Sequence, residues 1–140
     1  IIQFKDGKLI LNNKEIKRVE LNGKYKIRCG INPPDVKAFE ETLPNGKKYV
    51  AVYSKLGSTQ NTDKYKVPEN HFFFLGDNRD CSQDSRFLSR VGYVSSENIV
   101  GKASIIFFSN DTISGSVLKF WNLNKSLRID RFLKVLKWQI

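Results

Sequence analysis

Methionine is absent from the 140 residues, and histidine occurs only once. A chain without methionine cannot start an open reading frame at Ile1, so we expect these residues to be a piece of a longer protein. His71 lies within an aromatic run and gives no basis for a Ser-His-Asp triad. We interpret it as a packed or edge-exposed histidine.

Cysteine is almost as scarce, with Cys29 and Cys81 as the two examples. Two cysteines are too few for a disulfide framework, and neither lies in a CxxC or Cys/His array of the kind that binds zinc. A bridge between them stays open, although free or buried thiols are the interpretation we favour. We predict no metal and no cofactor.

Long apolar runs are also missing. The longest, residues 71–75 and 105–108, are far shorter than the roughly 20 residues that span a bilayer. The chain is 40% hydrophobic and 27% charged, which is typical of a globular domain. Because 140 residues can bury a sizeable core, we predict one domain over residues 1–140.

The net charge of +10 is concentrated at the two ends of the chain. Residues 1–28 carry eight basic and three acidic side chains, and residues 119–140 carry six and one, whereas residues 29–118 are balanced. Basic ends around a neutral middle suit an anionic membrane surface as well as a phosphate backbone. Composition leaves both partners open.

Turn signals divide the first fifty residues into β-rich runs. Asp6-Gly7, Asn22-Gly23 and Asn45-Gly46 are pairs that tolerate positive φ, and each lies next to runs of strand character. Three such turns predict antiparallel sheets and a mostly β fold. Residues 71–76 form a continuous aromatic run, which predicts a strand buried on both faces.

Near the C-terminus the spacing changes. Residues 126–138 have apolar side chains at helical intervals, with Arg and Lys between them. This pattern predicts a short basic amphipathic helix. A helix packed on the sheet is the interpretation we favour over a helix on a membrane surface, which Trp121 and Trp138 would suit.

The densest polar cluster is residues 76–86, Gly-Asp-Asn-Arg-Asp-Cys-Ser-Gln-Asp-Ser-Arg, directly after the aromatic run. Polar groups at the end of a rigid strand are a common setting for active sites. A calcium loop built on Asp77, Asp80 and Asp84 is a weak alternative, because Arg79 occupies a position where an EF-hand needs Asp or Asn. A polar turn with internal Asp to Arg pairs is the other alternative.

The cluster resembles the GDNRxxSxDSR signature of bacterial type I signal peptidases. Residues 6–13, 41–46 and 92–103 are similar to further segments of that family, so the resemblance spans residues 1–108. It implies a mostly β catalytic core of antiparallel sheets, with residues 21–67 as a cap-like insertion. Residues 68–140 would then return to the core and end in the helix.

The family removes signal peptides from translocated proteins at the outer, periplasmic face of the bacterial inner membrane, with a serine nucleophile and a lysine base. A lysine base needs no histidine, because burial can lower its pKa. The resemblance gives the loop residues supporting roles. Ser82 would orient the lysine amine, Asp84 would pair with Arg86, and Asp77 with an arginine beside the lysine. The remaining loop positions would be scaffold: Gly76, Asn78, Arg79 and Ser85.

The catalytic pair itself is not found in these residues. No proline follows a Ser-Met-x sequence, and Lys17-Arg18 lacks the continuation of the family's lysine box. We therefore expect the serine and lysine upstream of Ile1 and the isolated fragment to be inactive. Cys81 stands where the family usually has Asn.

The resemblance implies signal peptides of preproteins and an anionic membrane surface as partners. Two competing interpretations remain, a related serine-lysine enzyme and a basic β-rich module that binds nucleic acid or an anionic membrane. The aromatic residues lie in core-like runs and do not alternate with Lys and Arg, so we expect no nucleic acid partner.

Overall fold

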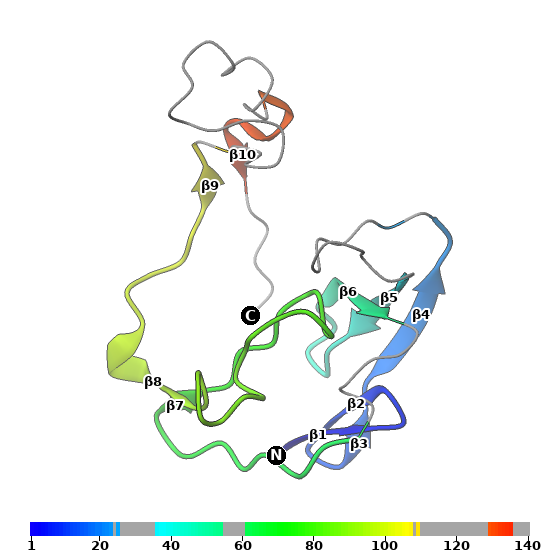
Figure 1. The fold of residues 1–140 in the computed structure, drawn as a ribbon, viewed down its shortest axis with the longest axis vertical. Coiled ribbons are helices and arrows are strands. Elements are labelled where there is room, and N and C mark those ends of the chain that lie inside the picture. The colour runs from blue at the N-terminus through cyan, green and yellow to red at the C-terminus, as the bar shows by residue number, and fades with distance from the viewer. Residues whose placement is uncertain (24, 26–35, 55–60, 108, 110–128, 136–140) are drawn as a thin grey trace. The chain divides into compact units, whose positions relative to one another are not determined.

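The computed structural model describes residues 1–23, 25, 36–54, 61–107, 109 and 129–135 (Figure 1). It divides into two compact units, Ile1–Ile99 and Val100–Ile140. The described residues are mostly β and form small antiparallel sheets, as the sequence predicts. No helix among them is both long enough and apolar enough to cross a membrane.

The chain begins with a three-stranded sheet. Asp6 and Gly7 have φ of 49° and 70°, the left-handed pair that a tight hairpin needs, so the predicted first hairpin is confirmed. A second turn follows at Asn12-Asn13, where both φ values are again positive. The strands are β1 (Ile2–Lys5), β2 (Lys8–Leu11) and β3 (Lys14–Glu15), in the order β1-β2-β3.

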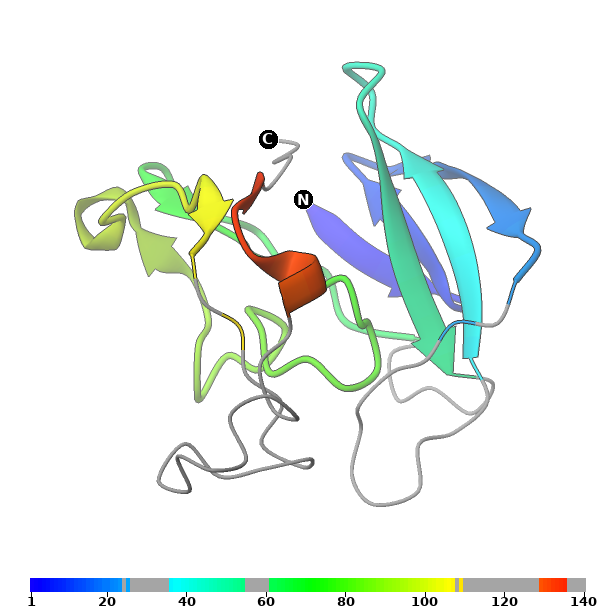
Figure 2. The same cartoon turned by 90° about the horizontal axis from the view of Figure 1, so that it is seen from above.

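A second sheet of longer strands follows, and Figure 2 shows its strands side by side. Gly46 has φ of 81° in the turn between its last two strands, which confirms the hairpin predicted at Asn45-Gly46. Part of the connection that follows Asn22-Gly23 lies outside the described residues. The strands are β4 (Lys17–Leu21), β5 (Val36–Thr42) and β6 (Lys48–Ser54), in the order β4-β5-β6.

One apolar core joins these two sheets. Its buried members come from β1, β2, β6 and the β3–β4 junction: Phe4, Leu9, Ile16, Ala51 and Tyr53. Tyr65, beyond the second sheet, exchanges backbone hydrogen bonds of 2.9 and 2.8 Å with Ile2. The chain therefore returns to β1 just before it enters the aromatic run.

The aromatic run is only partly a strand. β7 (His71–Phe72) pairs with β8 (Val94–Ser95), which leads into the 3-10 helix η1 (Ser96–Asn98). Phe72 and Phe74 are 45% and 46% exposed, so the predicted burial on both faces is wrong. The run alternates instead, because Phe73 packs against Tyr65 and Tyr93 on the inner side.

In the second unit β9 (Ile105–Ile106) pairs with β10 (Lys134–Val135). Residues 129–135 do not form the predicted helix: η3 (Ile129–Arg131) is a single 3-10 turn, and Leu133 has φ of 56°. A left-handed residue ends a right-handed helix, and strand pairing satisfies the backbone that follows. Residues 126–128 and 136–138 of the predicted helix lie outside the described residues.

Candidate functional site

The polar cluster runs alongside β6. The Val52 amide donates to the Asp77 carbonyl at 2.8 Å, and the Arg79 amide donates back to the Val52 carbonyl at 2.9 Å. The carboxylate of Asp80 accepts the Ser54 amide at 2.7 Å. Residues 77–80 thus form a short parallel extension of the second sheet, and this contact fixes the start of the loop.

Asp84 and Arg86 form a buried bidentate pair. The Arg86 Nε and Nη2 donate to the two carboxylate oxygens of Asp84, each at 2.7 Å. Asp84 also accepts the Gly76 amide at 2.8 Å. Burial alone would raise the pKa of Asp84, but the hydrogen bonds from Arg86 and Gly76 outweigh it and hold the pKa below its ordinary value.

Ser82 lies directly against Gly76. A Cβ atom added at Gly76 would be 1.9 Å from the Ser82 Oγ, so no larger residue fits without moving Ser82. The Ser82 amide donates to the Asn78 carbonyl at 2.9 Å, which fixes the backbone in a turn. Within the described part of the chain, the Ser82 hydroxyl makes no hydrogen bond, so its lone pairs and proton are available to another group.

Arg79 is buried opposite an equally buried carboxylate. Its Nη2 lies 2.9 Å from the Glu41 Oε2, and the two side chains are 2% and 1% exposed. Two phenols complete the group, because the hydroxyls of Tyr49 and Tyr53 donate to the two oxygens of Glu41. Burial raises the pKa of Tyr49 to about 12 and, more strongly, that of Tyr53. Both phenols therefore remain protonated donors at neutral pH.

The ring of Phe4 lies close to both buried guanidinium groups. The guanidinium carbons of Arg79 and Arg86 lie 5.7 and 5.5 Å from the centre of the Phe4 ring. Among the described residues, three buried nitrogens have no hydrogen-bond partner: Nε and Nη1 of Arg79 and Nη1 of Arg86. Attraction between the guanidinium charge and the face of the ring offsets part of the free energy that these unpaired nitrogens cost. In addition, the Arg86 Nη2 donates to the Arg79 carbonyl, so the two arginines are also linked directly.

The other predicted site residues play smaller parts. The Ser85 hydroxyl accepts the Phe74 amide at 2.9 Å, which attaches the loop to the aromatic run. Asp77 is exposed and accepts the amide of Asn78 at 2.9 Å, and it forms no ion pair with a described arginine. Asn78 contributes its carbonyl to the turn, whereas its buried Oδ1 has no hydrogen-bond partner among the described residues.

Cys81 is disulfide-bonded, so the interpretation as a free thiol is wrong. The sequence has one other cysteine, Cys29, which lies outside the described residues.

The calcium alternative is not supported by the geometry. The carboxylates of Asp77, Asp80 and Asp84 accept hydrogen bonds from three different donors, the amides of Asn78 and Ser54 and the side chain of Arg86. The part of the chain that the structure describes contains no group of three or more His, Cys, Asp or Glu side chains that could hold a metal ion.

Sequence reasoning missed Glu41 and the two tyrosines around it. A usable pattern was present: residues alternate faces along a strand, and Glu41 shares the core-facing side of β5 with Phe39. A carboxylate at such a position requires a buried cation or several donors. The pattern indicates that requirement, but not that Arg79 meets it from 38 residues away.

Comparisons with known proteins agree with this architecture. Residues 1–108 match the family described as "Signal peptidase, peptidase S26". The chain is 39% identical to "Signal peptidase I" of Rickettsia prowazekii (strain Madrid E) and 37% identical to that of Rickettsia akari (strain Hartford). Each alignment covers 95% of this chain, and 54% and 53% of the relatives. The chain therefore spans about half the length of these relatives.

No solved structure matches the chain. The family match covers the three small sheets of the first unit, the loop with its buried ion pairs, and β9. The relatives share more than a third of their aligned residues with nearly the whole chain. The chain belongs to the signal peptidase family, peptidase S26.

Proposed function

We propose that this chain is the C-terminal part of a membrane-bound serine endopeptidase that removes signal peptides from translocated proteins. The catalytic serine and lysine lie on residues that precede Ile1. The observation that carries the proposal is the placement of Ser82: its backbone is fixed by the buried loop, while its hydroxyl has no hydrogen-bond partner among the described residues. A fixed and available hydroxyl is what a lysine base needs for orientation.

In the proposed reaction a buried lysine is neutral near physiological pH, because desolvation lowers the pKa of its amine. The amine takes the proton of the serine hydroxyl as the serine oxygen attacks the scissile carbonyl. The lysine ammonium returns the proton to the leaving nitrogen, the peptide C–N bond breaks, and the new N-terminus of the mature protein leaves an acyl-enzyme behind. Water, deprotonated by the same amine, then hydrolyses the ester and restores the serine hydroxyl. Ser82 hydrogen-bonds the amine throughout and keeps it aimed at the nucleophile, without metal or cofactor.

The proposed location is the outer face of the bacterial inner membrane, where signal peptides of preproteins are the substrates. The charge distribution supports contact with anionic lipid, since residues 1–28 and residues 119–140 each carry a net charge of +5. Within this scheme residues 21–67 act as a cap-like insertion, and residues 68–140 complete the core.

The test compares residues 1–140 alone with the natural full-length protein in a preprotein cleavage assay. We expect cleavage by the natural protein and none by residues 1–140. Ser82→Ala in the natural protein should lower the cleavage rate by about 100-fold, since one orienting contact is lost. Ser109→Ala is the matched control and should leave the rate unchanged. Cleavage by residues 1–140, or no cleavage by the natural protein, would contradict the proposal.

A further inference from the structure

Glu41 is a buried carboxylate outside the signature loop. It is 1% exposed and lies on the core-facing side of β5, on the same hairpin as Tyr49 and Tyr53. Removing a carboxylate from water is costly unless it is paired and hydrogen-bonded. The three donors that meet the cost are the two phenols and the Nη2 of Arg79.

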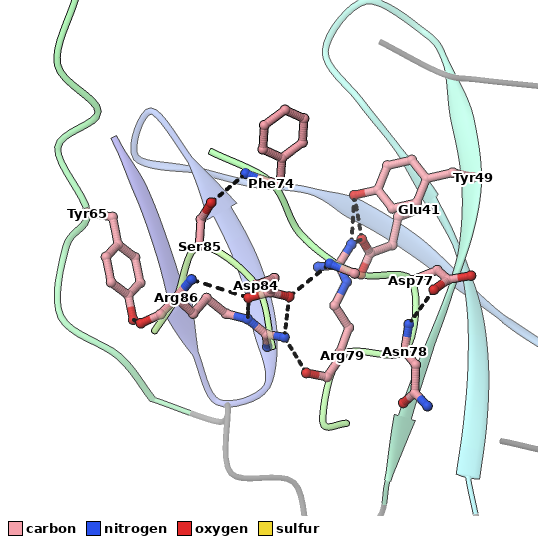
Figure 3. A network of polar contacts seen from close by, with 11 residues as sticks. Glu41, Tyr49, Tyr65, Phe74, Asp77, Asn78, Arg79, Asp84, Ser85 and Arg86 are labelled. Carbon is pink, nitrogen blue, oxygen red and sulfur yellow. Dashed lines mark hydrogen bonds and ion pairs between the residues drawn. The ribbon is translucent and has the colours of Figure 1, made fainter. Parts of the chain in front are cut away.

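Arg79 carries this contact into the loop. Its side chain binds Glu41, its amide donates to Val52 on β6, and its carbonyl accepts the Nη2 of Arg86. Arg79 thus contacts the β5–β6 hairpin through its side chain and its backbone amide. Its carbonyl also binds Arg86 of the Asp84–Arg86 pair (Figure 3). The guanidinium and the backbone of residue 79 are thus held by the same buried group of contacts.

The backbone of Arg79 lies inside the turn that carries Ser82. The Asn78 carbonyl accepts the amides of Cys81 and Ser82 at 3.3 and 2.9 Å, so the turn begins just before Arg79 and ends at Ser82. On its other side Ser82 touches Gly76, whose amide is held by Asp84. Ser82 therefore lies between two contacts that both lead back to Arg79.

We propose that Glu41 is a positioning residue of the peptidase site, because its carboxylate fixes Arg79 and Arg79 fixes the turn that carries Ser82. The inference rests on the proposed function of Ser82 and extends it to a residue that never touches the substrate. A buried ion pair is poor evidence for stability alone, since apolar replacements often do as well. Positional specificity is the role that this geometry supports.

The test is Glu41→Gln in the natural full-length protein, with Glu40→Gln as the matched control. Glu40 is the neighbouring residue on the other face of β5 and forms a surface ion pair with Lys48 at 2.8 Å. Surface pairs contribute little, so E40Q should leave cleavage within twofold of the natural protein. For E41Q we expect kcat to fall by about tenfold to 100-fold with little change in KM, the effect of a displaced catalytic contact.

Rates are measured well below the melting midpoint of each variant and expressed per folded molecule. E41D keeps the charge and should recover part of the lost kcat. Y53F removes one donor from Glu41 without removing the charge, and it should lie between E41Q and the natural protein. If E41Q cleaves like E40Q, or loses only folded fraction, the positioning role is wrong while the proposed function stands.

Hydrogen exchange gives a readout that needs no activity. The amides of Gly76, Arg79, Ser82 and Ser85 are all hydrogen-bonded in the loop. We expect E41Q to speed their exchange while the β1–β2 hairpin keeps its protection, and E40Q to change neither. If the natural protein fails to cleave preproteins, the proposed function fails and the catalytic part of the inference fails with it, and the exchange comparison then tests only whether Glu41 holds the turn that carries Ser82. Unchanged loop exchange in E41Q would overturn it.

Discussion

Gly76→Ala is the sharpest test of how Ser82 is placed. The added Cβ would lie 2.3 Å from the Ser82 Cβ, whereas ordinary contact begins at 3.4 Å. Ser82 must therefore retreat by about 1 Å, and misplacing a catalytic contact by that much costs about 100-fold in rate. Forcing an extra carbon into a packed site also costs about 1–3 kcal/mol of folding stability.

Two assays measure these effects in the natural full-length protein. Preprotein cleavage gives the rate, and denaturant unfolding gives the stability. Gly101→Ala is the matched control, because a Cβ at Gly101 has no heavy atom within 4 Å and the residue lacks a positive φ. The control should match the natural protein in rate and in stability.

A double-mutant cycle tests whether the effect of G76A comes from its contact with Ser82. Ser82→Gly removes the two atoms with which the new methyl group would clash and leaves only an ordinary contact of 3.5 Å with the Asp84 Oδ2. G76A should therefore cost far less stability in an S82G background than in the natural one. The reasoning is that Gly76 leaves room for Ser82 because it has no side chain. An equal loss of folding stability in the two backgrounds, or a G76A cleavage rate equal to that of G101A, would refute it.

Three further predictions concern charge and covalent structure. The pKa of Asp84 is lower in the folded protein than in the unfolded chain, so its ionised form stabilises the fold at pH values above the ordinary carboxyl pKa of about 4. This contribution is lost as the pH falls through the lower folded pKa. The melting midpoint of the natural protein should therefore fall more steeply with acid than that of D84N. A flat acid response would contradict it. Tyr49 should ionise near pH 12, and an absorbance titration of Y49F should lack the phenol ionisation that the natural protein shows at that pH. A reducing agent should lower the melting midpoint of the natural protein, since a disulfide contributes about 2–4 kcal/mol. C81S should have a lower melting midpoint without the reducing agent, and adding it should cause no further change.

Local patterns predicted the parts of the fold that local chemistry determines. Asp6-Gly7 and Asn45-Gly46 lie in hairpin turns, where Asp6, Gly7 and Gly46 adopt the positive φ that few other residue types tolerate. The helix predicted over residues 126–138 failed within residues 129–135, where Leu133 adopts a left-handed conformation and Val135 pairs with Ile105. Apolar spacing alone cannot tell a helix from a turn followed by a strand that pairs elsewhere.

The site was predictable to the extent that its residues are neighbours in the chain. The cluster 76–86 contains its own ion pair, Asp84 with Arg86, and its own close contact, Gly76 with Ser82. Long-range partners were not predictable in the same way. Glu41 reaches Arg79 across 38 positions, and only its place on the core-facing side of a strand hinted that it needs a cation.

The bond at Cys81 has a consequence for how the protein is made. Disulfides persist in oxidising compartments and are reduced in the cytosol. The residue just before Ser82 is therefore crosslinked only after the polypeptide has left the compartment of its synthesis, or after oxidation during purification. Material produced in a reducing host has this loop without its covalent tether. Preparations of the same sequence can thus differ in the loop that carries Ser82, and the oxidation state should be recorded with every measurement.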